Sequence, residues 1–314
     1  MNLNLTHIIS FCKGVFHGNS TEFTARHISI DSRSLQNGNN TLFVAIKGQN
    51  HDAHLYLEEL IAKGVRYFVV EYIPEHLYEK ANFIIVENSL KALQQTAIGY
   101  RKKFEFPFVG ITGSNGKTIV KEWLNFLLSP NHLIVRNPKS YNSQVGVPLS
   151  ILAIEGNYDL GIFEAGISLP NEMSNLEHII QPKYGILTNI GSVHDEGFSN
   201  REAKIKEKVQ LFENCSDIFL EKNTEIEVLL PENSQKHTWS FTDESANLFV
   251  SKKNENGKTE LTFKNAANTF SVNIPFSDEN SIENVITCVN FMLFLDEEIT
   301  FIQNRVAELY PVEL

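Results

Sequence analysis

The sequence is poor in cysteine and in long apolar runs. It has 3 cysteines among 314 residues, Cys12, Cys215 and Cys288, which are far apart and form no CxxC or Cys/His ligand pattern. This argues against a disulfide framework and a zinc site, and it fits a reducing cytoplasm. No apolar run approaches the roughly 20 residues of a membrane span, and residues 1–12 lack the basic start of a signal peptide. We therefore expect a cytoplasmic protein with no membrane span.

Positive charge is also scarce. The chain has 27 Lys and Arg residues against 38 Asp and Glu residues, which gives a formal net charge of −11. Because nucleic-acid phosphates need a basic face, we expect no nucleic-acid partner. A local basic pocket for a small anionic substrate is compatible with this charge. The hydrophobic content of 42% is ordinary for a globular protein, and the length suggests two domains.

The order of apolar runs predicts an α/β fold with two domains, 1–104 and 105–314. In the first we expect a helix at 5–12, strands at 27–30, 41–46, 66–71 and 83–86, and helices at 55–63 and from Ser89, as its cap, to about 103. From residue 105, strands and helices alternate, which is typical of a mainly parallel sheet covered by helices. Short strands after Pro231, with a hairpin turn at 254–257, predict a small β-rich extension before two final helices.

The stretch from Phe108 to Thr118 is the strongest functional signal. An apolar run enters a Gly-rich turn that ends in Lys-Thr, and a helical pattern follows. Such a unit presents backbone N–H groups to an anion, while the Lys can reach the β/γ-phosphates and the Thr hydroxyl can bind Mg²⁺. The full Walker pattern is not met, because Ile111 stands at its first Gly position. We interpret the stretch as a nucleotide phosphate loop, with a chance Gly-rich turn as the alternative.

Two other predicted strands end in polar groups. Ligands of parallel α/β sheets bind at the carboxyl ends of the strands. Strand 160–164 delivers Glu164, a candidate Mg²⁺ ligand that would otherwise be an exposed strand-end Glu. His194 follows strand 184–190, where it could bind a metal, orient a phosphate or be merely structural.

The predicted helix at 201–213 carries three lysines. We interpret Lys204 and Lys206 as a solvated basic face. At about 100° per residue, Lys204 and Lys208 share one face of the helix while Lys206 points away from it.

Together these motifs resemble the Mur ligase superfamily of ATP-dependent amide ligases in peptidoglycan precursor synthesis, and most closely its MurF branch. Residues 112–118 resemble the family form TGxNGKT, which accounts for the missing first Gly. Residues 163–166 stand where the family has its Mg²⁺-binding Glu, 188–194 resemble the segment with a metal-ligating His, and 208–214 resemble the segment with a carbamylated lysine. The resemblance implies ATP binding by Gly113, Ser114, Asn115, Gly116, Lys117 and Thr118, Mg²⁺ ligation by Thr118, Glu164, His194 and Lys208, and catalytic roles for Lys117, His194 and Lys208.

The resemblance extends to substrate-binding segments. Residues 30–33, 41–48 and 51–54 are similar to the pattern D[ST]R…LFVALKG…DxH of the family's UDP-binding domain, which implies roles for Ser32, Arg33 and Lys47. Residues 141–149 resemble NNxIGVPL, which implies a substrate contact for Asn142. Residues 279–284 take the place of the adenine-side motif, which implies an adenine contact for Asn284.

The implied reaction joins D-alanyl-D-alanine to UDP-N-acetylmuramoyl-tripeptide through an acyl phosphate, with ATP and Mg²⁺. Mur ligases have a third domain, and we expect this chain to lack it, so that it binds its ligands but turns over poorly. A fusion of the full protein to alanine racemase is left open. The alternatives are a MurE-type ligase that adds the third residue, a folylpolyglutamate synthetase, a module that only binds, and an unrelated P-loop NTPase. The pattern at 31–48 argues against the synthetase.

Overall fold

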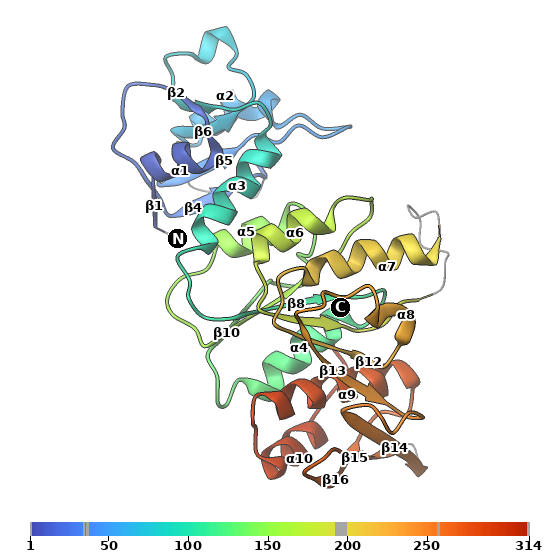
Figure 1. Cartoon of the computed structure of the whole chain (residues 1–314). Helices are drawn as coiled ribbons and strands as arrows, with labels where there is room; N and C mark the ends of the chain where they lie inside the picture. The colour runs from blue at the N-terminus through green and yellow to red at the C-terminus, as the bar shows by residue number, and fades with distance from the viewer. Residues whose placement is uncertain (1, 34, 36–37, 192–199, 256–257, 313–314) are drawn as a thin grey trace. The chain divides into compact units, whose positions relative to one another are not determined.

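The computed structural model describes residues 2–33, 35, 38–191, 200–255 and 258–312, and all structural statements below concern these residues (Figure 1). The chain forms two compact units. One comprises Met1–Glu105 with Gln144–Gly156, and the other comprises Phe106–Ser143 with Asn157–Leu314. Residues 144–156 therefore belong structurally with the first unit. The predicted assignment of 1–104 to the UDP-substrate and 105–314 to ATP remains a prediction.

The first unit is built on a five-stranded sheet in the order β2-β7-β6-β5-β4. Its strands are parallel except for the β2–β7 pair. The bounds of its elements are β1 Leu3–Asn4, α1 Leu5–Cys12, β2 Val15–His17, β3 Thr24–Ala25, β4 His27–Ser29, β5 Thr41–Val44, η1 Ala53–Tyr56, α2 Leu57–Ala62, β6 Tyr67–Val70, η2 Glu75–Leu77, β7 Asn82–Ile85, α3 Ser89–Arg101 and α5 Gly146–Leu152.

Two local predictions for this unit need correction. The helix expected at 55–63 begins as the 3-10 turn η1, and only Leu57–Ala62 are α-helical. The cap of α3 is Asn88 rather than Ser89, because the Asn88 side chain accepts a hydrogen bond from the backbone N of Lys91. Asn is as good an N-cap as Ser. The Ser89 backbone N–H is bound instead by the Glu71 carboxylate at 2.9 Å.

The second unit has a nine-stranded sheet in the order β16-β15-β14-β13-β12-β11-β8-β10-β9. It is parallel from β9 to β14, and β14, β15 and β16 pair antiparallel. The predicted β-rich extension is thus continuous with the main sheet. The bounds are β8 Phe108–Thr112, α4 Lys117–Leu128, β9 Ile134–Arg136, β10 Leu160–Glu164, α6 Met173–Ile180, β11 Tyr184–Leu187, α7 Arg201–Val209, η3 Gln210–Phe212, β12 Asp217–Glu221, α8 Thr224–Glu227, β13 Gln235–Ser240, β14 Leu248–Glu255, β15 Lys258–Lys264, β16 Thr269–Ile274, α9 Glu279–Phe294 and α10 Ile299–Ala307.

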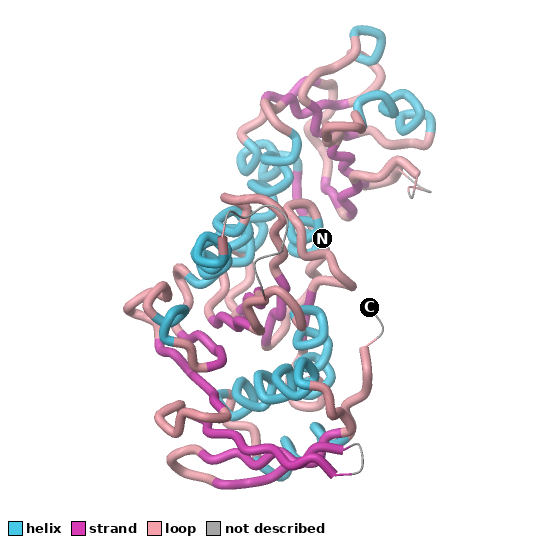
Figure 2. The backbone as a smooth tube through the Cα atoms, turned by 90° about the vertical axis from the view of Figure 1, so that its right-hand side faces the viewer, coloured by secondary structure: helices cyan, strands magenta, loops and turns pink. Residues whose placement is uncertain are grey.

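Helices cover both faces of this sheet. α4, α9 and α10 pack on one face, and α6 and η3 pack on the other. Figure 2 shows helices, in cyan, on both sides of the strands. The central strand β8 shows why: Val109 and Ile111 belong to the core beneath α4 and α9, while a Cβ at Gly110 would meet Pro182 and Leu211 on the opposite face. A strand buried on both faces reads as a continuous apolar run, as predicted for β8 and β10. None of the described helices is long and apolar enough to cross a membrane.

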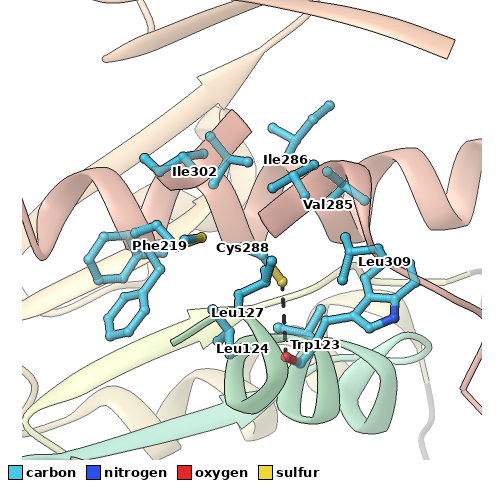
Figure 3. Close-up of a cluster of buried hydrophobic side chains, with 14 of the residues drawn as sticks. Trp123, Leu124, Leu127, Phe219, Val285, Ile286, Cys288, Ile302 and Leu309 are labelled. Atoms are coloured by element: carbon cyan, nitrogen blue, oxygen red, sulfur yellow. Dashed lines mark hydrogen bonds between the residues drawn. The ribbon is translucent and has the colours of Figure 1, made fainter. Parts of the chain in front are cut away.

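The core fixes α9 against α4. Trp123, Leu124 and Leu127 of α4 face Val285 and Cys288 of α9, with Phe219, Ile302 and Leu309 completing the cluster shown in Figure 3. The Cys288 thiol contacts the Val120 carbonyl oxygen of α4 at 4.0 Å. These side chains are at most 4% exposed, and a fully buried side chain of this size contributes roughly 1.5–3 kcal/mol. A continuous apolar core therefore holds α4 and α9 against each other.

Candidate active site

The loop between β8 and α4 requires glycine at two positions. Gly113 has φ +149°, and a Cβ there would lie 2.0 Å from Thr188 Oγ1. Gly116 has φ +81°, and a Cβ there would lie 2.3 Å from Asn284 Oδ1. Any larger residue would meet both backbone strain and a clash. The predicted Gly-rich turn is thus a tightly enclosed loop that leads directly into α4.

Two residues after β11 brace this loop. The Asn189 carbonyl oxygen accepts a hydrogen bond from Ser114 N at 2.8 Å, and Asn189 Oδ1 accepts one from Asn115 N at 3.1 Å. Thr188 Oγ1 donates to the Asn115 carbonyl oxygen at 2.5 Å. β11 ends at Leu187, earlier than the predicted end at 190, because these polar groups turn to the loop. The amides of the first turn of α4, which have no acceptor within the helix, are then the groups placed to meet an anion.

Two lysine ammonium groups converge on one carbonyl oxygen of the loop. Lys117 Nζ and Lys208 Nζ each lie 3.0 Å from the Gly113 oxygen, and Lys117 also donates to the Ser114 oxygen at 3.1 Å. The structure thus brings Lys208 of α7 to the phosphate loop. Lys204 is also buried, at 2% exposure, so the prediction that it is solvated is wrong. Lys206 is exposed and pairs with Glu202, as predicted for a solvated residue.

Glu164 lies at the carboxyl end of β10 and is completely buried. Its Oε1 accepts a hydrogen bond from Asn142 Nδ2 at 2.8 Å. Its Oε2 has no hydrogen-bond partner among the described residues. A buried carboxylate oxygen without a hydrogen bond is costly unless a cation compensates it, and the cation of the Lys121 side chain lies 3.8 Å from this one. This oxygen fits a Mg²⁺ ligand, and the alternative of an exposed strand-end Glu is wrong.

Lys121 and Asn137 were not identified from the sequence. Lys121 is completely buried, and its Nζ lies 3.8 Å from Glu164 Oε2. Burial lowers the pKa of this ammonium group, while Glu164 and Glu122 oppose the shift. For Lys121, the only signal in the sequence is its spacing from Lys117, which puts both lysines on one face of the helix. Asn137 is buried and bonds the backbone of Glu164 through both its N–H and its oxygen.

A pocket of about 330 Å³ opens beside the loop. Asn115, Thr188 and Asn189 line one part of it. Its lining also includes residues of α9, β12 and the start of α7: Asn280, Glu283, Glu221 and Arg201. Burial raises the pKa of Glu283, and the neighbouring Glu221 carboxylate raises it further. Asn284 lies one turn after Asn280 on α9, against Gly116. Asn284 therefore packs against the phosphate loop, and its contact with adenine stays a prediction.

The first unit holds the three remaining predicted substrate residues. Arg33 Nε and Nη2 both donate to the carboxylate of Asp31 at 2.9 Å, and this contact lowers the pKa of Asp31 to about 2. Ser32 is buried, and its carbonyl oxygen accepts a hydrogen bond from Lys63. Lys47 is exposed and forms a β-bridge with Asp52. Arg33 and Lys47 are accessible to an anion, although the Arg33 guanidinium already engages a carboxylate.

His194 lies outside the described residues, so its metal role stays a prediction. Within the described ranges, no three His, Cys, Asp or Glu side chains gather as a metal site. The predicted Mg²⁺ set does not depend on such a cluster, because it also uses the Thr118 hydroxyl and a modified Lys208.

The sequence also matches a known domain. The profile of the Mur ligase middle domain covers residues 111–292, which include the phosphate loop, Glu164, Lys208 and Asn284. This chain belongs to the Mur ligase family. As a Mur ligase it is similar to the UDP-N-acetylmuramoyl-tripeptide–D-alanyl-D-alanine ligase of Borreliella burgdorferi, with 31% identity over 94% of this chain and 67% of that protein.

Solved MurF structures share the fold of this Mur ligase. MurF from Acinetobacter baumannii superposes with a TM-score of 0.90 at 20% identity, over 100% of this chain and 69% of that chain. MurF from Thermotoga maritima in complex with ADP superposes with a TM-score of 0.81 at 24% identity, over 92% of this chain and 67% of that chain. The chain is therefore MurF-like and spans about two thirds of the length of these relatives.

Proposed function

We propose that the whole protein is an ATP-dependent amide ligase of the MurF type, which joins D-alanyl-D-alanine to UDP-N-acetylmuramoyl-tripeptide. The observation that carries this proposal is the enclosed loop at 113–118 with a buried, half-satisfied Glu164 at the end of the adjacent strand. The 31% identity to a ligase of that name supports the substrates, and the ADP complex of the Thermotoga maritima relative supports the nucleotide.

The loop and its lysine would hold the phosphates of ATP. The first-turn amides of α4 and the Lys117 ammonium group stabilise charge on the γ-phosphoryl group. The terminal carboxylate of the tripeptide attacks that group, and ADP leaves. The amine of D-alanyl-D-alanine then attacks the acyl carbon, and phosphate leaves with formation of the amide. The protein supplies position and charge here and needs no nucleophilic side chain.

One Mg²⁺ would be held by Thr118 and Glu164 and a second by His194 and a carbamylated Lys208, and the two would supply charge neutralisation between the nucleotide phosphates and the carboxylate nucleophile. Carbamylation of Lys208 is proposed from the resemblance of residues 208–214 to the family segment with a carbamylated lysine, and Lys208 Nζ lies at the phosphate loop, 3.0 Å from the Gly113 oxygen. A lysine ammonium group would be repelled by Mg²⁺, whereas a carbamate is an anion that could bind it. We propose that Asn284 contacts the adenine and that Asn142, Ser32, Arg33 and Lys47 contact the UDP-substrate.

The chain by itself is proposed to bind nucleotide and UDP-substrate without efficient turnover, because about a third of the relatives' length has no counterpart in it. The test is phosphate release from ATP with the UDP-tripeptide and D-alanyl-D-alanine, measured for this chain and for the full protein, with Lys117→Ala as the inactive control. We expect release by the full protein only when both substrates are present. Turnover only with a free diamino acid would favour the MurE-type alternative, and hydrolysis indifferent to the UDP-substrate would favour an unrelated NTPase. Efficient turnover by this chain alone would contradict the binding-only role.

A further inference from the structure

One buried cation near the proposed metal site has no part in the mechanism above. Lys121 lies one turn after Lys117 in α4 and has no exposed surface. Its ammonium group donates to the backbone carbonyl oxygens of Asn137, at 2.8 Å, and of Lys139, and it lies 3.3 Å from Glu122 Oε1. An ammonium group has three N–H donors, so these three oxygens account for its donor capacity.

The segment that Lys121 holds is the one that grips Glu164. The Asn137 side chain accepts a hydrogen bond from Glu164 N at 3.1 Å through Oδ1, and its Nδ2 donates to the Glu164 backbone carbonyl oxygen at 3.0 Å. These two bonds fix the backbone at the end of β10. Asn142, five residues further along the same segment, fixes Oε1 of the carboxylate. Lys121 Nζ approaches Oε2 only to 3.8 Å, which is too long for a hydrogen bond. The carboxylate is thus oriented through its backbone and one oxygen, and Oε2 is left for another ligand.

We propose that Lys121 is a positioning residue for the divalent cation: it anchors residues 137–142 so that Glu164 presents Oε2 to Mg²⁺. This inference rests on the proposed function, since it needs the Mg²⁺-nucleotide complex. The Glu122 carboxylate, 3.3 Å from the Lys121 ammonium group, offsets part of the positive charge beside the cation. The opposite role, in which Lys121 competes with the metal for Oε2, makes the opposite prediction.

The test is a calorimetric titration of the chain with ADP, once with Mg²⁺ and once with EDTA. The dissociation constant for ADP in EDTA divided by that in Mg²⁺ reports the contribution of the metal. For Lys121→Met, which keeps the length of the side chain but loses its donors and charge, we expect this ratio to fall about 10- to 100-fold, the usual cost of losing a group that orients a metal ligand. The affinity for ADP in EDTA should stay within about threefold of wild type, because Lys121 is proposed to act only through the cation.

Four further variants separate positioning from general damage. Lys121→Arg should retain most of the Mg²⁺ effect, and Lys121→Gln, which can still donate to two carbonyl oxygens, should lose less than the Met variant. The Gln variant also provides the measurement if Lys121→Met does not fold. Glu164→Gln should abolish the Mg²⁺ effect in the wild-type background and in the Lys121→Met background. Lys206→Met removes an exposed lysine of the same charge and should change nothing.

The outcomes distinguish the two levels of the proposal. Absence of ADP binding by the wild-type chain would contradict the proposed function. Normal wild-type binding with an unchanged Mg²⁺ effect in Lys121→Met and Lys121→Gln would overturn the inference alone. A tighter Mg²⁺ complex in these variants would show that Lys121 competes with the metal, and equal losses with Mg²⁺ and EDTA would show a merely structural role.

Discussion

Gly116→Ala tests whether the phosphate loop is fixed both by its backbone conformation and by Asn284. At φ +81°, an L-residue pays roughly 1–2 kcal/mol for the left-handed conformation. The added Cβ would lie 2.3 Å from Asn284 Oδ1, so the buried Asn284 side chain must move. Forcing it off its rotamer costs about 1 kcal/mol, so the free energy of unfolding should fall by about 2–3 kcal/mol in total.

Two comparisons separate the two contributions. Gly64 has a similar φ of +93°, but no described atom lies within 4 Å of a Cβ there, so Gly64→Ala should cost only the backbone share of about 1–2 kcal/mol. Asn284→Ala removes all three atoms that the new Cβ would meet. Gly116→Ala should therefore cost about 1 kcal/mol less in the Asn284→Ala background, as a coupling between contacting residues.

The assay is urea unfolding of the four single and double variants, with ADP titration beside it. Gly116→Ala should weaken ADP binding, since it strains the phosphate loop at the N-cap of α4, whereas Gly64→Ala should leave ADP binding unchanged. The reasoning is refuted if Gly116→Ala is no more destabilising than Gly64→Ala, or if the Gly116→Ala and Asn284→Ala effects are strictly additive.

Three further predictions concern single side chains. Burial alone would raise the pKa of Asp52, but hydrogen bonds from the backbone and ring of His54 bring it below its ordinary value of 3.8. The stability advantage of wild type over Asp52→Asn should therefore be full above about pH 5 and shrink toward pH 3. Urea unfolding measured across this pH range tests the expectation. Thr188→Val keeps the shape but removes the donor to the Asn115 oxygen, and should lower the free energy of unfolding by about 1–3 kcal/mol and weaken ADP binding in a titration. Burial raises the pKa of the Cys215 thiol, so a thiol reagent followed by mass spectrometry should label it only after unfolding; rapid labelling of the native chain would contradict its burial.

Much of the fold follows from periodicity. β8 and β10 are continuous apolar runs between turn signals, and α1 carries its apolar residues at helical spacing, so their ranges are predicted to within a residue. The errors fall at the ends of elements. β11 stops at Leu187 although an apolar Ile190 follows, because Asn189 accepts hydrogen bonds from the phosphate loop, which is far away in the sequence.

The candidate site was predictable where a motif is local and not where it depends on tertiary contacts. The loop at 113–118 is recognisable because its glycines, its lysine and its flanks are contiguous. Lys121 and Lys204 read as ordinary charged helix residues, and only the folded chain shows that both are buried. Asn137 carries no sequence signal, since its role is to bond the backbone of a strand that lies 27 residues away. Tertiary contacts between residues far apart in the sequence create these roles, and a single sequence does not encode them locally.

The acyl phosphate is the central claim, and an isotope transfer tests it most directly. UDP-N-acetylmuramoyl-tripeptide labelled with ¹⁸O in its terminal carboxylate is incubated with the full protein, ATP, Mg²⁺ and D-alanyl-D-alanine, and the released phosphate is analysed by mass spectrometry. Attack of the carboxylate on the γ-phosphoryl group predicts one ¹⁸O atom in each phosphate, and no labelled phosphate from Lys117→Ala. Phosphate released without the label would mean that water is the nucleophile, and would contradict the account.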